Sequence, residues 1–210
     1  MFSIIQAAGW PIWPLIICSV LGLALIIERF MSLKTAKVAP PQLLDEVLAA
    51  SRTALPAPEV IEQLGKNSVL GEVLASGLRA MLAQPGISDE ELHAALDSTG
   101  RIVTHRLERY LSALATIASV APLMGLFGTV VGMIEIFGSQ SPAAGGGANP
   151  AQLAHGISIA LYNTAFGLII AIPALIFWRY FRARVDEYLL TLELAGERLL
   201  QHLATLRKAS

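Results

Sequence analysis

The amino-acid sequence predicts an all-α integral membrane protein with three transmembrane helices, two of which extend into a cytoplasmic helical bundle. Of its 210 residues, 54% are hydrophobic and only 15% are charged, and its mean hydropathy is +0.60. Ordinary soluble domains carry about 25% charged residues, so this composition excludes a typical soluble protein. A hydrocarbon core of about 30 Å is spanned by about 20 apolar residues. Three runs approach or exceed that length: 10–27, 111–137 and 157–178.

The distribution of basic residues predicts the orientation of these spans. All fifteen Lys and Arg residues lie in two blocks, 29–109 and 179–208. Because positive residues near span ends mark the cytoplasmic side, we expect the N-terminus outside and the C-terminus inside. Of the sixteen Asp and Glu residues, fifteen share the predicted cytoplasmic face with the bases, and Glu135 is the exception.

The spans divide the chain into six expected segments. The first span should stay in the mature protein, because the N-terminus lacks the basic region of a secretory signal. A single cysteine, Cys18, excludes an intrachain disulfide. The segments are a periplasmic N-terminus with span 1 (1–31), a cytoplasmic helical domain (32–110), span 2 (111–138), a periplasmic loop (139–152), span 3 (153–181) and a cytoplasmic C-terminal helix (182–210).

Local signals predict where the long helices begin and what they contact. Ser88 and Glu91 form the pattern of a capping box, and no proline follows before Pro122, so one helix from Ser88 to Phe137 is expected. Asn149 should cap the third span, with Pro150 at the first helical position. A heptad seam, whose partner helix comes from this chain or a neighbour, is indicated by Val185, Leu189, Leu192, Leu199, Leu203 and Leu206.

Small residues in the second and third spans predict a close helix contact. In lipid, small residues allow backbones to approach and therefore mark contact faces. Prolines are tolerated in such helices as kinks, because neighbouring helices can satisfy the freed carbonyls. The candidate packing residues are Pro122, Gly125, Gly128, Gly132, Gly156, Ala160, Gly167 and Pro173.

Polar side chains within the spans are few, and two of them have two interpretations each. Thr129 either bonds back to its own backbone or lines a water-accessible pore together with Thr164. Glu135, about one turn from the outer end of its helix, either reaches the membrane interface or serves an outer proton entrance. The spans supply no acid or base near the midplane, so a proton path would need a carboxylate from a partner.

No motif in the sequence indicates catalysis or cofactor binding. The glycines lack the spacing of a dinucleotide fingerprint, and no strand is expected before them. Walker motifs, metal-ligand clusters and nucleophile elbows are absent, and the four histidines are scattered. We therefore expect no enzymatic activity, no cofactor, no metal site and no nucleic-acid partner.

Two long motifs resemble the ExbB/TolQ proton-channel family, which is related more distantly to MotA. They are PLMGLFGTVVGMIEIF at 122–137 and HGISIALYNTAFGLIIAIPALIFW at 155–178. These are similar to the family patterns P-x-x-G-L-x-G-T-V-x-G and G-I-x-x-A-L-x-x-T-A-x-G-L-x-x-A-I-P. MotA proteins have four spans, so the three-span layout resembles the ExbB or TolQ branch, and ExbB most.

The resemblance implies a homopentamer in the bacterial inner membrane. It would enclose transmembrane helices of ExbD (or TolR), each bringing an aspartate, and proton flow would power movement passed to TonB (or TolA). The family's pore threonines fall on Thr129 and Thr164, and Asn163 and Glu135 complete the candidate ion pathway. Many relatives carry glutamate where this chain has Ile159, so any role of that glutamate does not carry over.

Three functions are open at this stage. The first is an ExbB-type subunit that energises TonB-dependent outer-membrane transport. The second is a TolQ-type subunit of the Tol-Pal envelope-integrity system, which the neighbouring genes would distinguish from the first. The third is a non-conducting membrane scaffold, in which the threonines and Glu135 serve only to pack helices.

Overall fold

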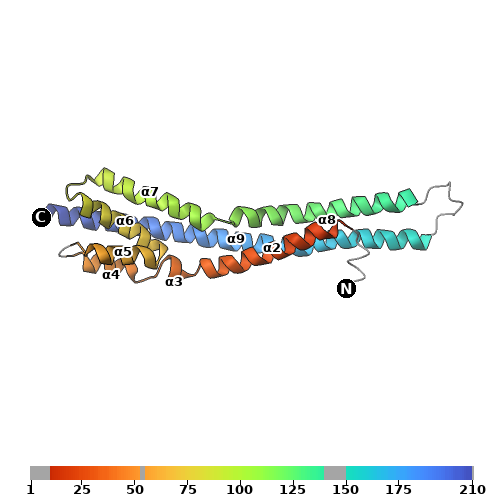
Figure 1. Ribbon diagram of the computed structural model, residues 1–210, viewed down its shortest axis with the longest axis horizontal. Coiled ribbons are helices and arrows are strands. Elements are labelled where there is room, and N and C mark those ends of the chain that lie inside the picture. Colours follow the sequence, from red (N-terminus) through yellow and green to blue (C-terminus); the bar gives the residue numbers. More distant parts are fainter. Residues whose placement is uncertain (1–9, 53–54, 140–149, 210) are drawn as a thin grey trace. The chain divides into compact units, whose positions relative to one another are not determined.

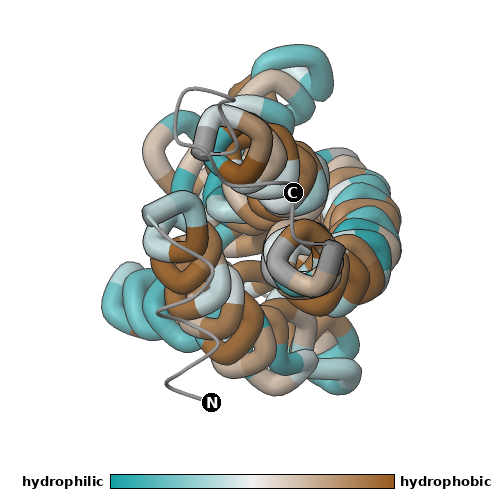
Figure 2. Tube along the Cα trace, turned by 90° about the vertical axis from the view of Figure 1, so that its right-hand side faces the viewer, coloured by the Kyte–Doolittle hydropathy of each residue, from teal (hydrophilic) through white to brown (hydrophobic). Residues whose placement is uncertain are grey.

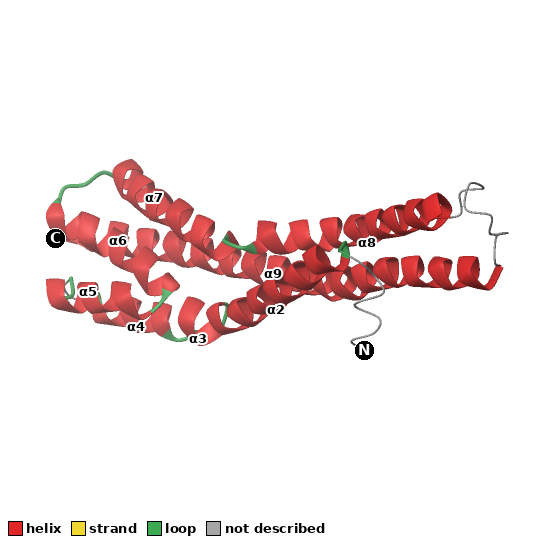
Figure 3. Ribbon diagram, turned by 45° about the vertical axis from the view of Figure 1, so that its right-hand side comes forward, coloured by secondary structure: helices red, strands yellow, loops and turns green. Residues whose placement is uncertain are grey.

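The structure is a computed structural model that describes residues 10–52, 55–139 and 150–209. Within those ranges every regular element is a helix and no strand occurs, which confirms the predicted all-α class (Figure 1, Figure 3). The helices are α2 (Ile12–Ser32), α3 (Thr35–Val38), α4 (Leu43–Ala50), α5 (Pro58–Asn67), α6 (Val69–Ala83), α7 (Asp89–Glu108), α8 (Leu111–Ser139) and α9 (Pro150–Ala209).

Three helical stretches of the described chain are long and apolar enough to cross a membrane. They are Ile12–Ser32, Asp89–Gly138 and Leu153–Arg207, and each contains a window with a mean hydropathy of 2.0. Figure 2, which looks along the helices, shows brown hydrophobic segments on several of them. The sequence prediction of three spans agrees with these lengths and compositions, whereas the orientation of the spans stays a prediction.

The chain forms two compact units. The first, here called the span unit, takes its described residues from 1–28 and 110–180, and the second, the polar unit, takes them from 29–109 and 181–210. Helices α2 and α9 contribute residues to both. The predicted segment boundaries stay predictions, since a division into compact units does not locate a bilayer.

The expected single helix from Ser88 to Phe137 is wrong, because the chain breaks between α7 and α8. Arg109 is extended, with φ −51° and ψ 138°, and Tyr110 has a φ of 67°. The left-handed conformation at Tyr110 costs a residue with a Cβ about 1–2 kcal/mol, so helical geometry stops there. Neither residue is a Gly or Pro, so the pattern of the sequence contained no sign of the break.

Helix α7 begins with the predicted capping box. The Ser88 Oγ accepts a hydrogen bond from the Glu91 N–H at 3.2 Å, and the Ser88 N–H donates to the Glu91 carboxylate at 3.0 Å. These bonds satisfy two of the backbone donors left open at a helix start. The backbone hydrogen bond from Ser88 also lowers the pKa of the Glu91 carboxyl, since it favours the charged form. Asn149, the other expected cap, lies outside the described residues.

The heptad seam of α9 is part of the core of the polar unit. Four of its six members are buried and two are half-buried. A methyl group placed on Gly77 of α6 would lie 3.0 Å from Leu96 Cδ2 of α7 and 3.3 Å from Leu199 Cδ2 of α9. Partners for the seam are therefore present in this chain, on α6 and α7.

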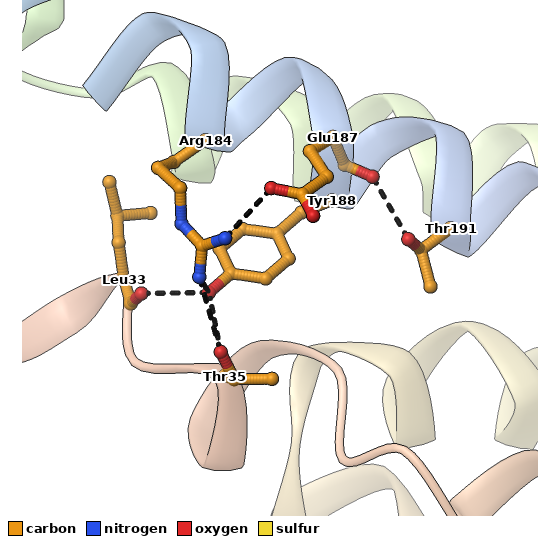
Figure 4. Close-up of polar contacts among 6 residues, drawn as sticks. All are labelled: Leu33, Thr35, Arg184, Glu187, Tyr188 and Thr191. Atoms are coloured by element: carbon orange, nitrogen blue, oxygen red, sulfur yellow. Dashed lines mark hydrogen bonds and ion pairs between the residues drawn. The ribbon is translucent and has the colours of Figure 1, made fainter. Parts of the chain in front are cut away.

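A buried tyrosine ties α9 to the segment that links α2 and α3 (Figure 4). Tyr188, only 3% exposed, donates from its hydroxyl to the Leu33 carbonyl at 3.0 Å. The Arg184 guanidinium donates to the same hydroxyl at 2.9 Å and to the Thr35 Oγ1 at 3.3 Å. The guanidinium carbon also lies 5.0 Å from the centre of the Tyr188 ring, a cation–π distance.

Removal of this hydroxyl should weaken the polar unit. In Tyr188→Phe the buried Leu33 carbonyl loses the hydroxyl that donates to it, so the free energy of unfolding should fall by about 1–3 kcal/mol. Chemical denaturation in detergent, followed by circular dichroism, measures the change. Tyr162→Phe is the matched control, because Tyr162 is 44% exposed. Equal free energies of unfolding in the two variants would contradict a stabilising hydrogen bond from the Tyr188 hydroxyl to the Leu33 carbonyl.

A candidate ion pathway along the helix pair α8 and α9

Helices α8 and α9 pack as an antiparallel pair in the span unit. The pairs in contact are Ala121 with Gly167, Gly125 with Asn163, Gly132 with Ala160, and Ile136 with Gly156. Residue numbers rise along α8 as they fall along α9, which defines the antiparallel direction. We call this row of residues the glycine seam.

The glycines of the seam leave no room for side chains. A methyl group on Gly125 would lie 2.7 Å from the Asn163 carbonyl oxygen, and one on Gly167 would lie 2.6 Å from the Ala121 carbonyl oxygen. Both obstacles are backbone atoms, which cannot rotate away. The seam therefore brings the two backbones together in the way that small residues permit in lipid.

The sequence reasoning missed some members of the seam. Ala121 is not among the candidate packing residues, yet it faces Gly167 and is 0% exposed. Ala121 also forms a buried cluster with Leu15 of α2 and Ala171 of α9. Positions 121, 125, 128 and 132 are spaced alternately by four and three, and this spacing keeps residues on one face of a helix. It is the sequence signal that indicates this contact face.

The two prolines lie inside continuous helices. Pro122 belongs to α8 and Pro173 to α9. Pro122 is half-buried and Pro173 is exposed within the single chain. Both helices continue past the proline, as membrane helices can when neighbours or local adjustments satisfy the freed carbonyl.

Thr129 makes the local hydrogen bond that one interpretation of the sequence proposed. Its Oγ1 donates to the Leu126 carbonyl at 2.6 Å. This bond uses the hydroxyl hydrogen and leaves the oxygen lone pairs able to accept. Thr129 and Thr164 are both partly exposed in the single chain, so neither hydroxyl is sealed within the seam.

The antiparallel geometry brings these two threonines to one flank of the pair. Gly128 faces Asn163, since a methyl group on Gly128 would lie 2.8 Å from the Asn163 Cβ. Thr129 and Thr164 each follow one member of this facing pair, a rotation of about 100° on a helix with 3.6 residues per turn. Viewed along one axis, two antiparallel right-handed helices turn in opposite senses. Both rotations therefore carry the threonine toward the same flank.

The other two candidate residues occupy different surroundings. Asn163 is only 2% exposed, and its side chain lies against Gly128 inside the seam. Glu135 is exposed near the end of α8. The structure thus brings Thr129, Thr164 and Asn163 together around one level of the helix pair.

The spans carry very little charge of their own. In the runs 10–27, 111–137 and 157–178, Glu135 is the sole Asp, Glu, Lys, Arg or His. Large apolar side chains are exposed on both helices of the pair, for example Leu123, Ile134, Ile169 and Ile176. Such surfaces suit contact with lipid or with further helices.

Comparison with known proteins identifies the class to which this helix pair belongs. Residues 65–194 match the MotA/TolQ/ExbB proton channel family. The chain belongs to this family. The matched region contains the whole of α8 and residues 150–194 of α9, including Thr129, Asn163 and Thr164.

Relatives from several bacteria support the assignment. The chain is 33% identical to the ExbB-like protein 3 of Synechocystis sp. over 85% of this chain and 83% of the relative. It is 32% identical to the biopolymer transport protein exbB1 of Vibrio cholerae, with 80% and 73% covered. It is 31% identical to the Tol-Pal system protein TolQ of Pseudomonas aeruginosa, with 82% and 77% covered.

The resemblance noted in the two sequence motifs is therefore confirmed. The MotA/TolQ/ExbB family consists of proton-channel and transport subunits rather than enzymes. Its members are membrane proteins, in agreement with the apolar helices of this chain. Similarity to both ExbB and TolQ relatives leaves the physiological system to be assigned on other grounds.

Proposed function

We propose that this protein is an ExbB-type proton-channel subunit of the bacterial inner membrane. Together with an ExbD-type partner it uses the proton motive force to energise TonB-dependent transport across the outer membrane. Family membership supports the class. The observation that carries the mechanism is the antiparallel α8–α9 pair, whose facing residues place Thr129 and Thr164 on one flank.

The chemistry of this flank calls for a partner that supplies an acid. A threonine hydroxyl can donate and accept hydrogen bonds to water or to a carboxylate, but it does not titrate in the range that proton transfer needs. Charges are costly inside a bilayer and mark ion paths where they occur. Glu135, near the end of α8, is the sole charged residue of the apolar runs 10–27, 111–137 and 157–178. A mid-depth proton carrier must therefore come from another chain.

In the proposed assembly, the single-span partner supplies the aspartate. Five copies of the chain form a ring, and the ring encloses two single-span partner helices that each carry one aspartate. The threonine flank lines the inside of the ring and hydrogen-bonds to the carboxylate and to water. Movement of the enclosed helices passes to TonB.

Variants of the two threonines test the proposal. Thr129→Val and Thr164→Val keep the shape of each side chain and remove its hydroxyl, so cells with the double variant should lose most proton-dependent outer-membrane uptake. Thr116→Val is the matched control. Thr116 lies on the same helix, and its Oγ1 donates to the Ser112 carbonyl at 2.9 Å, much as Thr129 bonds to Leu126.

The control separates a pore role from a local backbone role. If the hydroxyl of Thr129 serves only its own helix, the Thr116 and Thr129 variants should behave alike. Full uptake in the double variant would remove both threonines from the ion pathway. It would favour a non-conducting scaffold.

A TolQ-type role is the second candidate. The match to TolQ of Pseudomonas aeruginosa, at 31% identity over 82% of this chain, is nearly as strong as the match to exbB1 of Vibrio cholerae. Co-purification of the chain with its single-span partner decides between them. An ExbD-type partner supports the first proposal, and a TolR-type partner supports envelope integrity.

A further inference from the structure

Asn163 differs from every other polar residue that the structure describes in the span unit, because its side chain is buried. It is 2% exposed, whereas the other buried polar residues, Arg29, Ser51 and Ser68, belong to the polar unit. A methyl group on Gly128 would lie 2.8 Å from the Asn163 Cβ and 2.9 Å from its Cγ and Nδ2. The carboxamide thus fills the space that the missing side chain of Gly128 leaves.

Gly125 is the second glycine that contacts Asn163. Together, Gly125 and Gly128 form a notch in the surface of α8, in which Asn163 lies. A methyl group on Gly125 would lie 2.7 Å from the Asn163 carbonyl oxygen and 3.0 Å from the Thr164 Cα. The side chain of Asn163 therefore sits over one glycine while its backbone rests on the other. Only a pair of glycines three residues apart on α8 accommodates both.

We propose that Asn163 is a positioning residue that sets the register of α8 against α9 and thereby keeps Thr129 and Thr164 at one level on one flank. This inference rests on the proposed function, in which these two threonines line the ion pathway. Asn163 itself does not line the pathway, because its carboxamide is buried in the seam. Its effect on proton flow is exerted through the two threonines.

The small residues of the glycine seam do not by themselves determine the register of α8 against α9. Small residues recur along both helices, so a shift by one helical turn, about 5.4 Å, sets small residues opposite small residues again. Association through small residues in lipid therefore specifies the contact face better than the level along the axis. A single buried Asn fixes register in coiled coils in the same way, at some cost in stability.

Displaced registers are excluded by what lies next to the notch. A shift of one turn in one direction would set Asn163 against Ala121 and Met124. A shift in the other direction would set it against Thr129 and Gly132. In each case at least one side chain occupies space that the carboxamide and the backbone of α9 need.

Distances between spin labels on α8 and α9 test the register directly. The experiment uses the full-length protein in complex with its acidic partner, with Cys18→Ser and labels at Ile134→Cys and Leu161→Cys, both exposed positions. Labelled subunits are diluted with unlabelled ones so that each distance comes from one chain. We expect a single narrow distance distribution in the parent protein.

Asn163→Ala should broaden or split this distribution and lower proton flux in vesicles, while complex assembly is kept. Gly128→Ala should do the same, since it expels the carboxamide from the notch. The double variant, with Gly128→Ala and Asn163→Ala together, removes the overlap between the new methyl group and the carboxamide. It does not restore the side chain that fixes the register, so its proton flux should stay low. Ser158→Ala is the matched control, because Ser158 is exposed on the same helix and its Oγ bonds to the Ala154 carbonyl at 3.0 Å.

The outcomes separate this inference from the proposed function. A narrow, unshifted distribution in Asn163→Ala overturns the register claim, even if flux falls. A broadened distribution with full flux shows that register does not matter for conduction and overturns the positioning role. If the parent complex conducts no protons, the proposed function fails, and the label distances alone decide the register claim. Should Asn163→Ala fail to assemble, Asn163→Ser, which keeps a small polar group, replaces it in the same comparison.

Discussion

Gly125→Val is expected to abolish assembly of the complex. The first atom of the new side chain would lie 2.7 Å from the Asn163 carbonyl oxygen and 3.0 Å from the Thr164 Cα. Neither is the end of a flexible side chain, so α8 and α9 must separate. Because close backbone approach is the main attraction between such helices in lipid, separation removes the contact rather than weakening it. The recovery of assembled complex by size-exclusion chromatography in detergent measures the effect.

Gly138→Val supplies the control on the same helix. A methyl group at Gly138 would meet no atom within 4 Å, so this variant should assemble like the parent protein. Both substitutions add the same β-branched side chain to α8, which removes any difference in helix propensity. Normal assembly and flux of the Gly125 variant would show that the seam is not a close contact.

Leu199→Ala should lower the free energy of unfolding of the polar unit by about 2–5 kcal/mol. Leu199 is 0% exposed and contacts the space between Gly77 of α6 and Leu96 of α7. Truncation leaves a cavity that three packed helices close only in part. Chemical denaturation in detergent, followed by circular dichroism, gives the change.

Leu190→Ala is the comparison for this effect. Leu190 lies on the same helix and is 57% exposed, so its truncation should change the free energy of unfolding by less than about 0.5 kcal/mol. Equal losses of unfolding free energy in both variants would mean that the heptad seam of α9 does not pack in the core of the polar unit.

The hydropathy pattern of the sequence was sufficient for the fold class. Apolar runs close to or above the length that a bilayer requires predicted the three long helices, because a membrane span is specified by its length and its lack of polar residues. The capping box at Ser88 was predicted for a similar reason, since its donors and acceptors lie within four residues. Both signals are local, and neither depends on what the rest of the chain does.

The features that were missed depend on tertiary context. Tyr110 adopts its left-handed conformation at the junction of the two units, where no glycine or proline announces it. The sequence also contained no sign that the side chain of Asn163, one of the candidate pathway residues, is buried. Its burial against Gly128 depends on the register of a second helix, and a single sequence does not specify that register.

Proton flux into vesicles tests the central claim. According to this claim, the proposed ring of apolar helices has no titratable group near the middle of the membrane, and a partner chain supplies the aspartate that carries the proton. Three preparations are compared under an imposed membrane potential: the chain alone, the chain with its acidic single-span partner, and the chain with a partner whose aspartate is changed to asparagine. We predict flux above the protein-free background only in the second. Flux through the chain alone that equals that of the full complex would contradict the account.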